Sequence, residues 1–265
     1  MKLLQHFGLK HLPLGKGIPV LWQDAELARL QPRFEGLLET PGIGLITGEP
    51  GVGKTAILRQ LTQGLNPHRH RLVYLAETDF GRLDLYRGLA LALGLEPKHR
   101  RAELWRDLKA RIQELTEHKR QQPVWIIDEA QNLPKEFFRD LPAFLNFAFD
   151  SRDLMTVWMA GHPSLAHTLE RAPYAALYSR IRTRLRLEPI RERERFTALI
   201  RHGFEQAGAT QTLIADTGME LLRQASQGLP RKAASILQRS MELAMENNLN
   251  HLPDECIGQA IEELR

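Results

Sequence analysis

The feature that most constrains this chain is a glycine-rich stretch at residues 48–55 that lies between two apolar segments. It reads Gly-Glu-Pro-Gly-Val-Gly-Lys-Thr and matches the pattern G-x-x-x-x-G-K-[ST] at every fixed position. Residues 44–47 before it suit a buried strand, and Ile57, Leu58 and Leu61 after it repeat at helical spacing. A strand, a tight turn and a helix N-terminus aim several backbone N–H groups at one point, an arrangement that binds polyphosphates. The alternative, a chance glycine turn, leaves the flanking strand and helix patterns unexplained.

The residues of this phosphate loop have distinct expected roles. Gly51 and Gly53 allow backbone conformations that a Cβ atom would hinder. The Lys54 ammonium is expected to reach the β- and γ-phosphates of ATP, and the Thr55 hydroxyl to hold Mg²⁺. The sequence thus predicts ATP and Mg²⁺ as cofactors, bound by Gly48, Glu49, Pro50, Gly51, Val52, Gly53, Lys54, Thr55 and Ala56.

A second anchor is the acidic pair Asp128-Glu129, which follows the apolar run Val124–Ile127. Continuously apolar strands are typical of a parallel sheet that is covered on both faces. Asp128 is expected to hold the Mg²⁺ ion, and Glu129 to orient or deprotonate the attacking water. Together with Lys54 these acids predict ATP hydrolysis rather than binding alone. The alternative is that the two acids merely open a loop.

The composition fits a soluble globular protein, with 43% hydrophobic and 26% charged residues. The longest apolar runs, 124–127 and 155–160, are too short to cross a bilayer, and the first eight residues have no signal-peptide core. Cys256 is the sole cysteine, which excludes an internal disulfide and suits a reducing compartment. We therefore expect a cytoplasmic protein without a membrane partner.

Strand and helix patterns alternate up to about residue 188, and only helical patterns follow. This order predicts an α/β domain, with a parallel five-stranded sheet flanked by helices, followed by a small all-helical lid domain. The expected boundaries are an N-terminal segment 1–23 packing near the nucleotide or covering the core, an ATPase domain 24–190 and a lid 191–265. Expected strands are 44–47, 72–76, 124–127, 154–160 and 184–187, and expected helices include 24–38, 84–93, 102–115, 135–149, 193–207, 214–227, 230–247 and 254–264.

Four further residues are candidates to act on the phosphates. His162 follows the fourth strand, where a polar side chain can sense the γ-phosphate, although a surface histidine is the alternative. Arg180, and as second choice Arg182, precede the fifth strand and are candidates to stabilise the transferring phosphate of a neighbouring subunit. Both are otherwise surface or DNA-facing arginines. The run Gly228–Arg231, which reads Gly-Leu-Pro-Arg, is expected to begin a helix of the lid. Arg231 is therefore a candidate γ-phosphate contact, and the alternative is an exposed residue of a capping loop.

The order of these motifs resembles that of AAA+ ATPases, a class of P-loop NTPases. More specifically, Asp128–Leu133 and Ala160–Leu165 are similar to the DEAQ-N-L and G-Q-P-x-L segments of the ExeA-like ATPases, and His6–Leu9 is similar to the start of that group. His162 stands where the group usually has glutamine. The group includes the TnsC, TniB and Mu B type regulators of DNA transposition. Because the sequence ends at Arg265 with no membrane span or further domain, we expect this type rather than the secretion type.

That resemblance implies oligomerisation with ATP on double-stranded DNA, as a ring or helical filament. The oligomer would mark a target and recruit or activate a transposase, with a target-selection protein as a further partner, and hydrolysis would drive disassembly. Residues expected to face DNA are Thr78, Arg82, Lys98, Arg100 and Arg101. The alternatives are an ExeA-like ATPase of secretion or pilus assembly, and an ATPase of the replication-initiator or helicase-loader type.

Overall fold

The computed structural model describes residues 2–16, 20–23, 25–76 and 81–265, which form two compact units. The helical unit contains Met1–Asp24, Pro50–Ala56 and Glu188–Arg265. The sheet unit contains Ala25–Glu49 and Ile57–Leu187. Thr78, one of the residues expected to face DNA, lies outside the described residues.

The sheet unit is built on five parallel strands in the order β2-β3-β4-β1-β5. Every residue of β1 and β4 is buried, as expected of inner strands in a parallel sheet that is covered on both faces. The prediction of a parallel five-stranded sheet flanked by helices is confirmed. The strands are β1 (Ile43–Gly48), β2 (His70–Leu75), β3 (Gln122–Ile127), β4 (Thr156–Gly161) and β5 (Ile181–Leu187).

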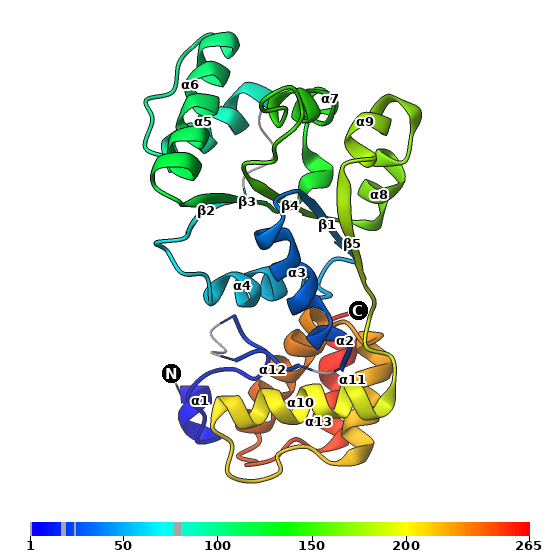
Figure 1. Cartoon of the computed structure of the whole chain (residues 1–265). Coiled ribbons are helices and arrows are strands. Elements are labelled where there is room, and N and C mark those ends of the chain that lie inside the picture. Colours follow the sequence, from blue (N-terminus) through cyan, green and yellow to red (C-terminus); the bar gives the residue numbers. More distant parts are fainter. Residues whose placement is uncertain (1, 17–19, 24, 77–80) are drawn as a thin grey trace. The chain divides into compact units, whose positions relative to one another are not determined.

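Helices cover both faces of this sheet (Figure 1). One face carries α3 (Leu30–Glu39) and α4 (Lys54–Gln63), and the other carries α5 (Arg82–Ala92), α6 (Arg101–Gln113) and α7 (Lys135–Phe144). The shorter elements of the unit are α2 (Ala25–Ala28), η1 (Glu114–His118), η2 (Ala130–Asn132), α8 (Pro163–Leu169), η3 (Ala172–Tyr174) and α9 (Ala175–Tyr178).

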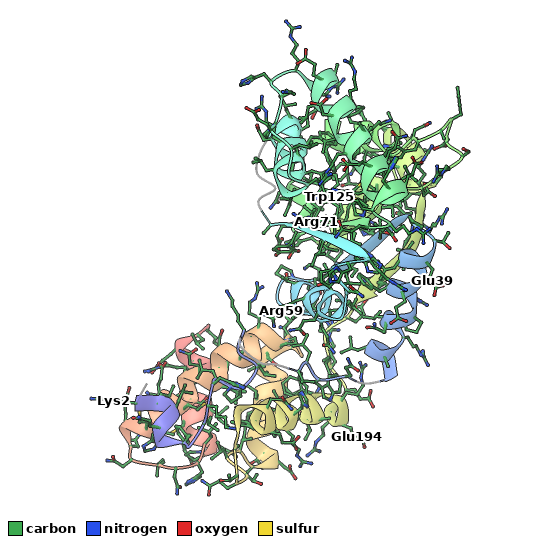
Figure 2. All side chains as sticks on the ribbon, turned by 60° about the vertical axis from the view of Figure 1, so that its left-hand side comes forward. Lys2, Glu39, Arg59, Arg71, Trp125 and Glu194 are labelled. Atoms are coloured by element: carbon green, nitrogen blue, oxygen red, sulfur yellow. The ribbon has the colours of Figure 1, made fainter. Side chains whose placement is uncertain are left out.

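Aromatic side chains fill the space between the helices and the sheet. Trp125 of β3, labelled in Figure 2, is fully buried and lies 5.8 Å from the Phe137 ring of α7, centroid to centroid. On the other face, the Phe34 ring of α3 stacks on Trp158 of β4 at 5.5 Å. Strand residues therefore alternate between two cores, which holds the carboxyl ends of the strands in fixed positions.

Gly44 is the position on β1 that this packing constrains most tightly. It pairs with Trp158 on the neighbouring strand β4. A Cβ atom on Gly44 would lie 2.3 Å from a carbon of the Trp158 ring, closer than any non-bonded contact allows. The indole therefore lies across the bare backbone of β1, and no side chain can be added there without moving it.

We expect Gly44→Ala to lower the free energy of unfolding by about 2–3 kcal/mol, because the new methyl group overpacks the core. The matched control is Gly36→Ala in α3, where a Cβ meets nothing within 4 Å. That control is expected to raise the free energy of unfolding by about 0.4–1 kcal/mol through lower chain entropy in the unfolded state. Urea unfolding of both variants measures the difference. Equal effects of the two substitutions would contradict this account of the core.

Several elements of the sheet unit differ from their predicted extents, and the helix expected over 24–38 is divided into α2 and α3 at Arg29. The helix expected over 135–149 ends at Phe144, because Ala148, Phe149 and Asp150 take positive φ values of 48°, 56° and 63° and form a tight turn. Residues 145–149 include Leu145, Phe147 and Phe149, so their largely apolar composition gave no sign of that turn. Strand β5 begins at Ile181, earlier than expected. Its exposed arginines alternate with buried residues, so the start of the strand lacks the apolar run by which the other strands were recognised.

The helical unit has a separate core. It is formed mainly by α10 (Arg193–Ala207), α11 (Asp216–Ser226), α12 (Pro230–Glu246) and α13 (Asp254–Glu263), with α1 (Lys2–His6) beside them. Phe7 and Leu9 of the N-terminal segment belong to this core, together with Phe196 and Ile200 of α10. The nucleotide contact expected of segment 1–23 stays a prediction. In the part of the chain that the structure describes, every helix is too short or too polar to span a bilayer.

Candidate nucleotide-binding site

The phosphate loop connects the end of β1 to the start of α4. Strand β1 ends at Gly48, and α4 begins at Lys54. Gly51 and Gly53 have φ values of +83° and +108°, a region that favours glycine and explains why both positions lack a side chain. The first N–H groups of a helix have no partner within it, so α4 presents donors and the positive end of its dipole to an anion.

Lys54 is the first residue of α4, and only 5% of its surface is exposed. A buried ammonium is costly unless negative charge or hydrogen-bond acceptors surround it, which makes Lys54 suited to a polyanion. Thr55 is exposed on the same turn, with a hydroxyl able to act as a metal ligand. Of the other loop residues, Val52 is buried, whereas Glu49 and Pro50 are exposed. Ala56 lies in the first turn of α4.

Asp128 directly follows β3 and is 3% exposed. Its Oδ1 atom accepts a hydrogen bond from the Glu129 N–H at 2.9 Å, and its Oδ2 atom accepts one from the Tyr74 hydroxyl at 3.2 Å. Partial burial, reinforced by the charge of Asp128, raises the pKa of Tyr74 to about 12, so the hydroxyl keeps the proton that it donates. These contacts fix the orientation of the carboxylate. Sequence patterns did not identify Tyr74, since it lies on a different strand.

Glu129 has a left-handed backbone, with φ 49° and ψ 37°. Non-glycine residues adopt this conformation at an energetic cost and concentrate at functional sites when they do. The Glu129 Oε2 atom accepts a hydrogen bond from Gln131 Nε2 at 2.7 Å and lies 3.8 Å from His162 Nε2. The structure therefore brings His162 to the acidic pair, as expected of a residue that follows the neighbouring strand.

These groups meet at one edge of the sheet. Strands β1, β3 and β4 are parallel, so their carboxyl ends lie together, with Gly48 ending β1, Asp128 following β3 and His162 following β4. Open parallel sheets bind their ligands at this edge. Asp128 and Glu129 thus lie at the edge where β1 leads into the phosphate loop.

Arg231 contacts the phosphate loop within the helical unit. Its N–H donates a hydrogen bond to the Gly51 carbonyl at 3.2 Å, and a Cβ on Gly51 would lie 2.9 Å from the Arg231 Cβ. Gly228 permits this approach with a φ of +76°, and its carbonyl accepts a hydrogen bond from the Ile190 N–H at 2.9 Å. The exposed Arg231 side chain therefore starts from a backbone position beside the loop.

The candidate trans-acting arginines lie at the opposite edge of the sheet. Arg180 immediately precedes β5 and forms an ion pair with Asp150, while Arg182 pairs with Asp153 at 2.8 Å. Strand β5 is parallel to β1, so its start is remote from the edge that holds Asp128. The structure does not bring these arginines to the acids of their own subunit.

The described candidates for DNA contact lie on α5, α6 and the segment between them, and Arg82 is half-buried whereas Lys98, Arg100 and Arg101 are exposed. Arg82 and Arg101 both pair with Asp140, at 3.1 Å and 2.7 Å, so the structure brings these two residues together. Arg100 lies 3.8 Å from Glu103, and Lys98 is exposed. Asp140 offsets part of the positive charge at this surface.

Comparisons with known proteins find a family model, a curated protein and solved structures that this chain is similar to. Residues 37–169 match the family model of the AAA domain. General secretion pathway protein A of Aeromonas hydrophila is 29% identical over 232 residues, which cover 86% of this chain but only 42% of that protein. The chain therefore spans less than half of the length of that relative.

Solved structures share the fold. The ORC2 protein of Aeropyrum pernix, in its ADPNP-ADP complexes, superposes with a TM-score of 0.72 at 16% identity, covering 94% of this chain and 70% of that one. The ORC1 protein of the same organism, in complex with DNA, has a TM-score of 0.69 at 19% identity, with coverage of 95% and 68%. Because the matched family model takes in half of the sequence, from before the phosphate loop to beyond the acidic pair, this chain belongs to the AAA domain family.

Proposed function

We propose that this chain is a Mg²⁺-dependent ATPase whose subunits assemble when they bind ATP. The observation that carries the proposal is the buried Asp128, followed by a strained Glu129, at the sheet edge where β1 enters the phosphate loop. Family membership and the fold shared with an ADPNP-ADP complex support the choice of nucleotide. A loop that only bound nucleotide would need no strained acid at this edge.

The residues present fit a magnesium ion. Mg²⁺ prefers oxygen ligands, keeps several waters and is bound by few protein groups when phosphates complete its shell. The Thr55 hydroxyl and the Asp128 carboxylate would supply the protein oxygens, and the Tyr74 hydrogen bond holds that carboxylate in place. When bound, the ion would neutralise charge on the β- and γ-phosphates.

In this proposal each side chain of the site has a separate role in hydrolysis. Lys54 and the N–H groups of the loop bind the phosphates, and Glu129 orients the attacking water and accepts its proton. His162 lies close enough to Glu129 to respond to the γ-phosphate. Arg231 would report the nucleotide state to the helical unit from its position beside Gly51.

The position of Arg180 supports assembly of several subunits in this proposal. An arginine at the edge of the sheet opposite the acids is suited to the active site of a neighbouring subunit. A contact of this kind joins two different surfaces of identical subunits and so builds a ring or a helical filament.

We expect Arg180→Ala to lower ATP hydrolysis at least about 100-fold without changing ATP affinity, since such an arginine acts on the transition state. Mixing this variant with Glu129→Gln subunits, which keep Arg180 but lack the base, should restore part of the activity. Phosphate-release assays on the mixtures measure this. Arg152→Ala is the control, because Arg152 lies two residues from Asp150, the partner of Arg180, but itself pairs with Glu117. No recovery on mixing would contradict action in trans.

Of the two candidate cellular processes for this ATPase, secretion has more support than transposition. The relative in Aeromonas hydrophila is named for the general secretion pathway, whereas transposition rests on the motif resemblance alone. We therefore propose a secretion-type assembly ATPase. Co-purification of the full chain with a membrane partner in an ATP-dependent manner is the expected result.

DNA binding is the second candidate, supported by the basic residues Arg82, Lys98, Arg100 and Arg101 and by the fold shared with the ORC1 protein in complex with DNA. Filter retention of labelled duplex DNA at low salt, with ATP or ADP, tests it. DNA retention that requires ATP and is weaker in the double variant Lys98→Ala/Arg100→Ala would favour DNA binding. It would also favour an ATPase of the transposition-regulator or replication-initiator type. No retention at low salt would remove it.

A further inference from the structure

The side-chain amide of Gln131 joins the proposed catalytic acid to the end of the neighbouring strand. Its Nε2 atom donates to Glu129 Oε2 at 2.7 Å, and its Oε1 atom accepts from the His162 N–H at 3.0 Å. We propose that Gln131 is a positioning residue that holds the Glu129 carboxylate ready to orient water and ties it to the turn after β4. This inference rests on the proposed ATPase function.

The backbone fixes Gln131 where this bridge can form. Gln131 lies in the short turn η2 directly after the left-handed Glu129. Ala130 is fully buried and anchors the turn, and the Asn132 N–H donates to the Glu129 carbonyl at 3.0 Å. The strained backbone of Glu129 thus reverses the chain so that side chains two residues apart meet.

Gly161, the last residue of β4, leaves room for the amide. A Cβ on Gly161 would lie 2.7 Å from Gln131 Oε1 and 2.8 Å from Leu165 Cδ2. Any larger residue would push Gln131 away from both of its partners. Glycine at position 161 therefore leaves the space that the Gln131 amide occupies.

The chemistry of the bridge suits glutamine. It needs a donor toward a carboxylate and an acceptor toward a backbone N–H, and a neutral amide offers both at its two ends. A glutamate at this position would repel Glu129, and a lysine or arginine could not accept from His162. A carboxylate held by a hydrogen bond from this amide loses less freedom when water must be oriented.

His162 gains a second role from this geometry. Its backbone N–H, at the start of α8, is the group that fixes the acceptor end of the amide. A shift of the turn after β4 would move Gln131 and, through it, Glu129. The turn after β4 is thereby coupled to the residue proposed to orient water.

The test replaces Gln131 by methionine, which has nearly the same shape and lacks both hydrogen bonds. Single-turnover hydrolysis by Gln131→Met should fall about 10- to 100-fold, the usual effect of losing a hydrogen bond to a charged group. The affinity for ATP, measured by calorimetry, should stay within about twofold. Gln113→Met, the same change at an exposed position on α6, is the control and should leave the rate unaltered.

A double-mutant comparison separates positioning from general damage. In the Glu129→Gln background, Gln131→Met should cause no further loss, because the residue acts through Glu129. Gly161→Ala should reproduce the loss seen with Gln131→Met, and it decides the question if the methionine variant does not fold.

Three results would overturn the inference. The first is an unchanged hydrolysis rate in Gln131→Met. The second is a raised rate in that variant, which would mean that Gln131 restrains Glu129. The third is an equal further loss of rate when Gln131→Met is added to Glu129→Gln. Each of these leaves the proposed ATPase function standing, provided that the unaltered protein hydrolyses ATP. If the unaltered protein does not hydrolyse ATP, both proposals fail.

Discussion

Lys54→Ala is expected to weaken the binding of MgATP at least about 100-fold and to abolish measurable hydrolysis. The lysine begins α4, where helix N–H groups and the helix dipole already favour an anion, and its side chain is buried beside them. Charge-assisted hydrogen bonds to phosphate are roughly twice as strong as neutral ones, and a buried one is screened little by salt. Calorimetric titration with MgATP measures the effect.

The matched control for this loss is Lys119→Ala. Lys119 is exposed, and its ion pair with Glu114 spans 3.2 Å at the surface, so its removal changes little. Both variants should keep the thermal unfolding profile of the unaltered chain within a few degrees. Unchanged ATP affinity in Lys54→Ala would remove the basis for the phosphate loop and for every proposal built on it.

Glu129→Gln is expected to separate nucleotide binding from hydrolysis. The neutral amide cannot accept a proton from water, so the rate of hydrolysis should fall about 100- to 1,000-fold, within the range for loss of a general base. Binding of ATP should persist because Glu129 contacts water rather than the phosphates in the proposed geometry. Subunits that bind ATP without hydrolysing it should also remain assembled longer, which light scattering after gel filtration measures.

Glu136→Gln is the control for this substitution, because Glu136 is an exposed acid in the first turn of α7. Its hydrolysis rate should equal that of the unaltered chain. A Glu129→Gln variant that hydrolyses ATP at the normal rate would assign the base to another residue. Joint loss of ATP affinity would instead indicate a structural role for Glu129.

Much of this architecture could be predicted from the sequence, because its signals are local. The phosphate loop lies between a strand and a helix that their own apolar spacing reveals, and β3 is apolar up to Asp128. The five strands and their parallel arrangement followed from those runs. The extent of α7 was wrong at its carboxyl end, since three residues with positive φ form a turn that apolar spacing does not register.

The remaining parts of the site depend on contacts between distant segments. Tyr74 reaches Asp128 from a different strand, and Asp150 pairs with Arg180 across 30 positions of the sequence. The role of Gln131 depends on a backbone N–H at position 162 and on the missing Cβ of Gly161. No pattern of residue types along the chain specifies these pairings, because each is set by the packing of whole elements.

The most direct test of the account is the release of phosphate from ATP by the purified full chain, measured with Mg²⁺ and again after chelation with EDTA. The account predicts release that requires Mg²⁺ and falls to background in Asp128→Asn, since that carboxylate is the proposed protein ligand for the ion. Release that is unaffected by EDTA and by Asp128→Asn would contradict it. So would tight binding of MgATP with no release of phosphate at any protein concentration that supports assembly.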